Sequence, residues 1–243
     1  MKNGFVRVLW GEYDDTKRFY RRRSKMDKDI KLAQANTFEP DFITFVFGED
    51  NQKMLTDLGI ESILADKRPI VWDMDTQQFR HKIQAFKLGM EMFDEMVFLD
   101  WDCQPFKKIP NNFWEILRKK ESLQAILRMY KRRKATWRKD DQRKIPCASF
   151  VYINDKEVPK RLIEKWEILN RPWSEEIVMC RYMEDIMGGW KGLDEYWDRF
   201  EPDFFVLEEG YVFPQNKLST KNHCFRHYNE KARTRMLRRL KKG

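Results

Sequence analysis

A short apolar run that is followed at once by two carboxylates constrains this chain more than any other stretch. Residues 96–99 are typical of a buried strand, and Asp100 and Asp102 follow where that strand should end. Ligands of open α/β sheets bind at the carboxyl ends of the strands. Paired carboxylates hold a hard divalent cation that keeps coordination positions open for phosphate oxygens. The stretch therefore predicts a metal-assisted site for a nucleoside diphosphate.

The stretch before these acids predicts a long amphipathic helix. Its apolar residues recur at spacings of four and three on one face: Phe79, Ile83, Phe86, Met90 and Phe93. Lys82 lies outside this stripe, which is as typical of a surface lysine as of one that reaches toward a diphosphate. Strands are expected at residues 5–10, 42–47, 60–64, 145–153, 201–207 and 210–213, and helices within 14–38 and at 51–58, 158–169 and 174–187.

A second pair of acids, Asp73 and Asp75, competes with the first as a metal site. Asp75 is well placed as the N-cap of the amphipathic helix, with Gln78 as the returning partner of a capping box. We therefore interpret Asp75 as structural, while Asp73 stays open as a ligand.

The charge of the chain favours an anionic partner without identifying one. A formal net charge of +9 suits a sugar nucleotide, an acidic glycan, a nucleic acid or a membrane surface. The basic run at residues 131–144 is typical of a solvated segment, with an electropositive rim beside the site as the alternative. Residues 231–242 are a candidate basic amphipathic helix, either solvated or in peripheral contact with a membrane.

The 243 residues contain no Pro/Gly/Ser-rich linker and no repeat, which favours a single domain. The four cysteines are far apart and form no Cys-x-x-Cys pair, which argues against a zinc site. No apolar segment is typical of a signal peptide or a transmembrane helix. These features predict a cytoplasmic protein with reduced thiols.

A family resemblance rests on the acids and on the helix before them. Residues 98–102, in which Asp100 and Asp102 flank Trp101, resemble the Asp-x-Asp motif of GT-A-fold glycosyltransferases. Residues 79–86 are similar to the helix with a lysine that precedes this motif in many members of the family.

This resemblance implies a fold and an activity. The fold would be a single α/β domain with a mostly parallel sheet flanked by helices, in which residues 1–103 form the donor half and residues 104–243 the acceptor half. The activity would be transfer of a sugar from a nucleoside-diphosphate sugar, most often UDP-linked, to a glycan or glycolipid acceptor, with Mn²⁺ or Mg²⁺ as cofactor. The positive charge of the chain favours an anionic acceptor.

The resemblance also implies metal ligands. Asp102 and His227 would bind the cation, and Asp100 would contact the cation through water or the ribose. His223 is the alternative to His227. Glu230 stands where retaining relatives with a His-x-x-Gly-x-x-Lys-Pro-Trp ending have glycine, so the chain departs from that pattern.

The remaining roles concern the sugar nucleotide and the acceptor. An inverting transferase needs a carboxylate that removes the proton of the acceptor hydroxyl. Glu175 or Glu176 would supply it, with Glu184 and Asp185 as substitutes, although Ser174 as N-cap and the helix dipole also explain acids at these first positions. The expected donor-binding residues are Trp10, Gly11, Tyr13, Asp66, Lys82, Asp100 and Trp101.

Two other functional classes remain open on the sequence alone. A nucleic-acid-binding protein would explain the basic run, but the adjacent acids repel phosphate unless a cation intervenes, which argues against this class. A metal-dependent phosphoryl transferase or nuclease is the other alternative, because it would use the same Asp100 and Asp102 pair.

Overall fold

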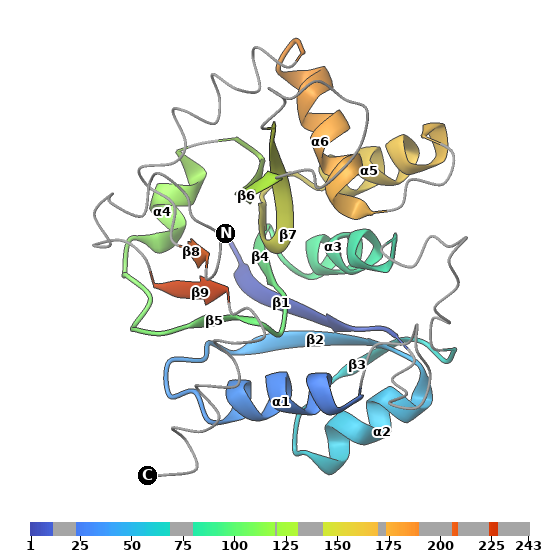
Figure 1. The fold of residues 1–243 in the computed structure, drawn as a ribbon, viewed down its shortest axis with the longest axis vertical. Coiled ribbons are helices and arrows are strands. Elements are labelled where there is room, and N and C mark those ends of the chain that lie inside the picture. The colour runs from blue at the N-terminus through green and yellow to red at the C-terminus, as the bar shows by residue number, and fades with distance from the viewer. Residues whose placement is uncertain are drawn as a thin grey trace.

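Two β-sheets organise the chain (Figure 1). A computed structural model describes residues 1–11, 23–68, 80–119, 121–130, 143–169, 174–189, 206–208 and 224–227. Within these residues, a six-stranded sheet has the strand order β3-β2-β1-β4-β7-β6, and a three-stranded sheet has the order β5-β9-β8.

Four strands of the larger sheet run parallel: β1 (Asn3–Leu9), β2 (Phe42–Phe47), β3 (Ile63–Asp66) and β4 (Glu95–Leu99). The described helices between them are α1 (Arg23–Gln34), α2 (Glu49–Asp57) and α3 (Arg80–Met92). The third strand begins later than expected, because the backbone N–H of Ile60 donates to the carbonyl of Leu55 and still belongs to the end of α2. Parallel strands bring their carboxyl ends to one edge of the sheet, so Asp66, the last residue of β3, and Asp100, which follows β4, lie at the same edge.

The other two strands of this sheet form an antiparallel hairpin, β6 (Leu123–Tyr130) and β7 (Arg143–Ile153). β7 runs against β4 with Leu99 opposite Phe150. The residues of β7 before Phe150 therefore extend past the end of β4. The hairpin thus lies beside the point where the two acids leave the sheet.

Helices cover both faces of the larger sheet (Figure 1). α1 and α2 pack on one face, and α3 packs on the other together with α5 (Glu157–Ile168) and α6 (Glu175–Ile186). The small sheet, of β5 (Cys103–Pro105), β8 (Val206–Glu208) and β9 (Phe225–His227), lies near α4 (Phe113–Arg118). This arrangement confirms the expected α/β fold class.

The period-two pattern of β1 explains why both faces are covered. Val6 and Val8 pack in the cluster with α3, α5 and α6, whereas Leu9 packs with α1 and α2. The predicted apolar stripe of α3 is confirmed, since Ile83 and Phe86 are fully buried.

An ion pair lies at the start of β4, at the edge of the sheet opposite the two acids. Glu95 is fully buried, and its carboxylate accepts hydrogen bonds from the guanidinium of Arg118 on α4 and from the hydroxyl of Tyr152 on β7. Burial and this carboxylate raise the pKa of Tyr152. The network joins α4 and the hairpin to β4, far along the strand from the two acids.

Several expectations lie outside the described residues. They concern Tyr13, Asp73, Asp75, His223, most of the basic run at 131–144 and the tail at 231–242. All four cysteines are buried thiols. In the described part of the chain, no helix combines the length and apolarity that a membrane span requires.

Candidate functional site

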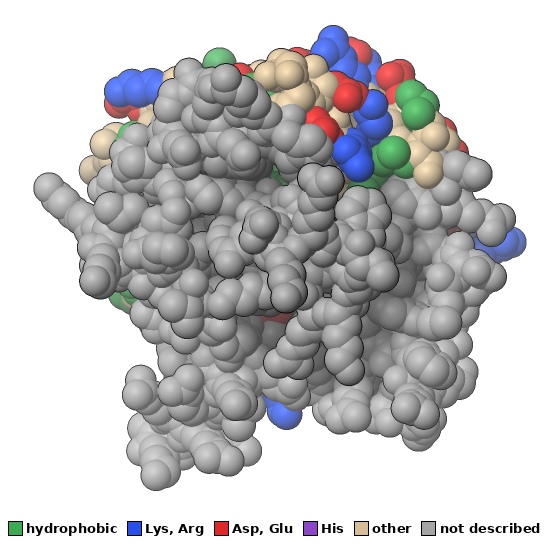
Figure 2. Space-filling model, turned by 45° about the horizontal axis from the view of Figure 1, so that its top comes forward, with side chains coloured by type: hydrophobic (Ala, Val, Ile, Leu, Met, Phe, Trp, Pro, Cys, Tyr) green, Lys and Arg blue, Asp and Glu red, His purple; other side chains and the backbone are tan. Residues whose placement is uncertain are grey.

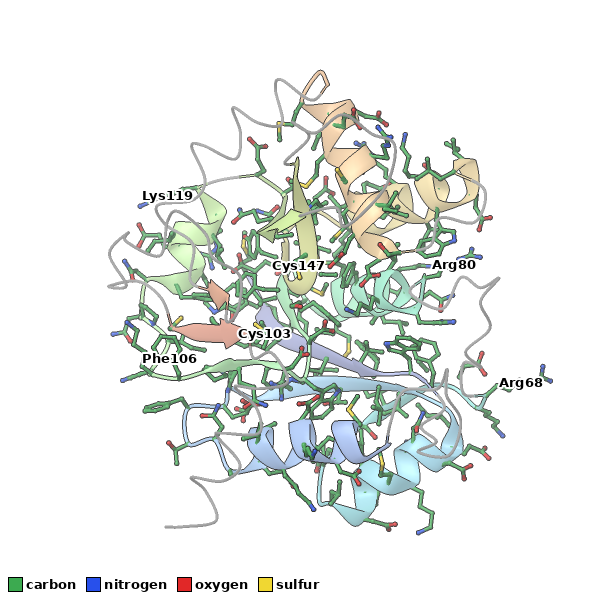
Figure 3. All side chains as sticks on the ribbon, in the orientation of Figure 1. Arg68, Arg80, Cys103, Phe106, Lys119 and Cys147 are labelled. Carbon is green, nitrogen blue, oxygen red and sulfur yellow. The ribbon has the colours of Figure 1, made fainter. Side chains whose placement is uncertain are left out.

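The two acids leave the sheet in a tight turn at the end of β4. The backbone N–H of Cys103 donates to the carbonyl of Asp100 at 2.9 Å, and the N–H of Asp100 donates to the carbonyl of Ser149 on β7 at 3.0 Å. The side chain of Asp100 is 25% exposed and Asp102 is half-buried. Figure 3 shows Cys103 and Cys147 inside the fold, whereas Arg68 and Lys119 extend from its periphery. The turn therefore presents its acids at a rim between the parallel strands and the hairpin.

Trp101, between the two acids, is turned into the protein. Its side chain packs with Leu9 and with α1 residues, and its indole Nε1 donates to the carbonyl of Val8 at 3.1 Å. Only 5% of Trp101 is exposed. A contact between Trp101 and a donor nucleotide would therefore involve its backbone.

Lys82 joins Asp100 to a distant helix. Its ammonium Nζ lies 2.7 Å from Oδ2 of Asp100 and 3.0 Å from Oε1 of Glu175 at the start of α6. The side chain is only 5% exposed, so the interpretation of Lys82 as a surface lysine is wrong. The same nitrogen lies 5.8 Å from the ring centroid of Phe98. The ammonium of Lys82 thus forms ion pairs with both Asp100, after β4, and Glu175, on α6.

Glu175 is the most deeply buried acid of this cluster. It is 3% exposed, and its second oxygen, Oε2, has no hydrogen-bond partner among the described residues. Burial raises the pKa of Glu175, with Lys82 opposing that shift and the negative charges of Glu176 and Asp100 adding to it. Glu175 therefore holds a proton more readily than an exposed glutamate.

Ser174, which precedes Glu175, adds a second buried polar atom. It occupies the expected N-cap position of α6, but its side chain makes no capping hydrogen bond. Its hydroxyl is buried, without a partner in the described part of the chain. Two adjacent residues thus offer polar atoms that a bound molecule can satisfy.

The other candidate bases lie elsewhere on α6. Glu184 pairs with Arg181, and Asp185 pairs with Lys165 of α5. These acids are more than two helical turns from Glu175, or about 14 Å along the axis. Glu176 is half-buried and acts on the pKa of Glu175 through its charge.

The ends of β1 and β2 are tied together by a residue that sequence reasoning missed. The side-chain amide of Asn51 on α2 donates to the carbonyl of Gly11 at 3.0 Å and to that of Phe47 at 2.8 Å. Trp10, just before Gly11, is 2% exposed and packs among the α3-side residues. One polar residue among many in a polar helix gave no signal of this role.

Asp66 caps the end of β3. Its carboxylate Oδ1 accepts the backbone N–H of Arg68 at 2.9 Å, and its carbonyl accepts the N–H of Gly48 at 2.8 Å. The side chain is exposed at the same edge as the other candidate donor residues. Its observed contacts shape the turn.

The strand register places residue 227 next to the turn. β9 runs antiparallel to β5, and His227 lies opposite Cys103, the residue after Asp102. Among the side chains that the structure describes, no group of three or more His, Cys, Asp or Glu residues is assembled for a metal ion. The turn itself fits Mn²⁺ or Mg²⁺ chemically, because both cations prefer oxygen ligands such as the carboxylates of Asp100 and Asp102.

Comparisons with known proteins give weak structural similarity. No family model and no curated protein matches the chain. The chain is similar to the glycosyltransferase GlyE of Streptococcus pneumoniae TIGR4, at 14% identity over 95% of this chain and 55% of GlyE, with a TM-score of 0.44. The apo form of GlyE matches over the same shares with a TM-score of 0.42.

A third structure is a Bacillus anthracis protein described as a glucose-1-phosphate thymidylyltransferase, in complex with sucrose. It matches at 14% identity over 82% of this chain and 84% of its own, with a TM-score of 0.37. The chain spans about half the length of GlyE. At TM-scores of 0.37 to 0.44, the function is argued from the geometry of the site and not from these neighbours.

Proposed function

We propose that the protein is a metal-dependent glycosyltransferase that moves a sugar from a nucleoside-diphosphate sugar, UDP-linked in the simplest case, to a hydroxyl of a glycan or glycolipid. The observation that supports this most is the Lys82 bridge between Asp100 and Glu175, beside Asp102 on the turn after β4. Gathering buried charges is costly unless each is paired, so such a cluster in a fold is a candidate functional site.

Asp100 and Asp102 would hold the divalent cation and the diphosphate. When bound, the cation would offset the negative charge that builds on the departing diphosphate. The ammonium of Lys82 holds the carboxylate of Asp100 in a defined orientation at 2.7 Å before a ligand arrives. His227 remains the proposed additional ligand, because its strand pairs beside the turn.

Glu175 and Ser174 would face the transferred sugar. A buried polar atom without a hydrogen bond costs roughly 1–3 kcal/mol, and sugar hydroxyls would supply the missing partners of the Glu175 carboxylate and the Ser174 hydroxyl. In an inverting reaction Glu175 would also take the proton of the acceptor hydroxyl. Its raised pKa makes it a stronger base than an exposed carboxylate.

A thermal-shift screen of nucleotide sugars with and without Mn²⁺ tests the proposal. We expect one nucleotide sugar to raise the melting temperature only when Mn²⁺ is present, and the same compound to be hydrolysed slowly or transferred. Metal-independent stabilisation, or none across a complete set of nucleotide sugars, would refute the assignment.

Product analysis separates sugar transfer from phosphoryl transfer at the same acids. A glycosyltransferase releases UDP from a UDP-sugar, whereas cleavage within the diphosphate releases UMP. In the coloured upper part of the face in Figure 2, Lys and Arg side chains lie next to Asp and Glu side chains.

A further inference from the structure

A buried arginine lies behind the acidic turn. Arg7 on β1 is 2% exposed, although its neighbours on the same strand face, Phe5 and Leu9, are apolar core residues. The carbon Cζ of its guanidinium lies 3.7 Å from the ring centroid of Phe42 and 4.9 Å from that of Trp101. The guanidinium therefore contacts the indole that separates the two acids.

One acid holds this arginine in place. Glu39, in the chain between α1 and β2, forms an ion pair and hydrogen bond with Nη1 of Arg7. Burial lowers the pKa of Arg7 and raises that of Glu39, while each partner opposes the shift of the other. The negative charge of Asp100 also acts on Arg7, so the guanidinium lies within electrostatic reach of the site.

Stability alone does not account for this pair. Nε and Nη2 of Arg7 and Oε2 of Glu39 are buried without hydrogen-bond partners in the described part of the chain. Apolar residues of similar volume often replace a buried ion pair with no loss of stability. The pair instead gives the Arg7 guanidinium a defined orientation against the indole of Trp101.

The turn is fixed from this side at several points. The indole of Trp101 donates to Val8 of β1, and the side-chain amide of Gln104 donates to the carbonyl of Trp101 at 2.8 Å and to that of Asp29 on α1 at 3.2 Å. The face of the same indole lies against Arg7. Movement of Trp101 would change the direction of both neighbouring carboxylates, because all three residues share one tight turn.

We propose that Arg7, oriented by Glu39, is a positioning residue that fixes Trp101 and thereby the directions of the Asp100 and Asp102 carboxylates. Its catalytic consequence rests on the proposed glycosyltransferase function. The positioning itself is a property of the unliganded chain and is measured without that function.

Hydrogen–deuterium exchange of Arg7→Met tests the positioning. Methionine fills similar volume without charge or planar stacking, so the amides of residues 99–105 should exchange faster by about tenfold, equivalent to 1.4 kcal/mol of local opening. Exchange in α5, on the other face of the sheet, should stay unchanged, and the melting temperature should fall, because Glu39 loses its partner. Unchanged exchange at 99–105 would overturn the proposal.

Arg118→Met is the control, because the more exposed Arg118 also pairs with a glutamate, the buried Glu95, at the opposite edge of the sheet. It should lower the melting temperature without changing exchange at residues 99–105. Equal acceleration there in both variants would show a general effect of losing an arginine, and would overturn the proposal.

If Arg7→Met does not fold, Glu39→Gln provides the second variant, since it keeps the arginine but removes the charge that orients it. It should accelerate exchange at residues 99–105 in the same direction, and unchanged exchange would again overturn the proposal. In Arg7→Lys, the amides of residues 99–105 should be only partly protected from exchange, because lysine retains the charge but not the planar group that stacks on Trp101.

Measurement of turnover tests the catalytic consequence of this positioning. A shift of about 1 Å in catalytic groups can cost about 100-fold in rate, so Arg7→Met should lose kcat in that range when it is assayed well below its melting temperature. Full kcat in Arg7→Met would overturn the catalytic consequence. An inactive wild-type protein would instead refute the proposed function, and the exchange experiment would still decide the positioning.

Discussion

The ammonium nitrogen of Lys82 lies 2.7 Å from Oδ2 of Asp100, a residue 18 positions later in the chain. α3 and β4 are consecutive elements, so the parallel crossover itself brings the start of the helix to the carboxyl end of the strand. Glu175 then reaches the same nitrogen from α6. The contact between Lys82 and Asp100 therefore follows from the topology of the sheet. The contact between Lys82 and Glu175 depends instead on how α6 packs against the hairpin.

Removing Lys82 should destabilise the protein. Lys82→Met leaves Glu175 buried without its cation, which should lower the free energy of unfolding by about 3–5 kcal/mol. The double variant Lys82→Met/Glu175→Met removes both charges and should recover most of that loss, while turnover stays absent in both proteins. Urea denaturation measures the free energies. A double variant as unstable as the single one would contradict the importance of this pair.

Asp102→Asn should remove a metal ligand without unfolding the chain. Calorimetric titration of UDP in the presence of Mn²⁺ should show affinity reduced by about tenfold or more, equivalent to at least 1.4 kcal/mol. Asp94→Asn is the control, because Asp94 is exposed at the other edge of the sheet, where it accepts the backbone N–H of Lys2. Equal UDP affinity in the two variants would argue against Asp102 as a ligand.

Glu175 should make stability depend on pH in a defined direction. Its pKa is raised above the ordinary value of 4.5, so above that pH the folded state holds a proton that the unfolded chain has released. Stability from Glu175 is therefore greatest below pH 4.5 and falls as the pH rises through the folded pKa. Glu175→Gln should reduce this decline.

Urea unfolding of both proteins between about pH 4 and pH 8 measures the difference, which covers the titration range of a raised carboxyl pKa. Glu39 also has a raised pKa, but it is present in both proteins and cancels in the comparison. Parallel stability curves for wild type and Glu175→Gln would show that Glu175 titrates as an ordinary glutamate.

Asn51→Ala should weaken both the fold and donor binding. Loss of the Asn51 amide leaves the carbonyls of Gly11 and Phe47 without this donor, which should cost roughly 1–3 kcal/mol. KM for the nucleotide sugar should rise, because the end of β1 loses its tie to α2. Gln52 lies on the same helix as Asn51, and its side-chain amide makes only a long 3.5 Å contact with the carbonyl of Ser62. Gln52→Ala should therefore change neither the stability nor the KM. A KM that rises equally in both variants would indicate a general effect of α2.

The sequence predicted those elements whose own hydrophobic pattern shows which residues face the core. Residues 42–47 were expected as a strand and are β2, and the apolar stripe through Ile83 and Phe86 faces the core as expected. The strand expected at 60–64 is present as β3, but it begins only at Ile63, because the backbone N–H of Ile60 still donates to the carbonyl of Leu55 at the end of α2. Hydrophobic runs locate strands, but helix ends are set by hydrogen bonds that periodicity does not reveal.

The site was harder to predict, because its members are brought together by elements far apart in sequence. Helical periodicity places Lys82 outside the apolar stripe of α3, which is correct, but its burial comes from α6. The capping pattern at Ser174 was consistent with a simple helix start, yet the hydroxyl makes no capping bond. Arg7 was not singled out, since arginine side chains are mostly exposed and the sequence does not show that Glu39 and Trp101 lie against this one.

The antiparallel course of β7 against β4 has a consequence for how such a protein can diverge. Since Leu99 lies opposite Phe150, the earlier part of β7 continues beyond the last residue of β4, and Ser149 sits beside Asp100. One side of the rim is thus encoded by a hairpin that is separate in sequence from the parallel strands. Under the proposed function, insertions in that hairpin would change the selectivity for the acceptor, while the acids proposed to bind the donor stay unchanged.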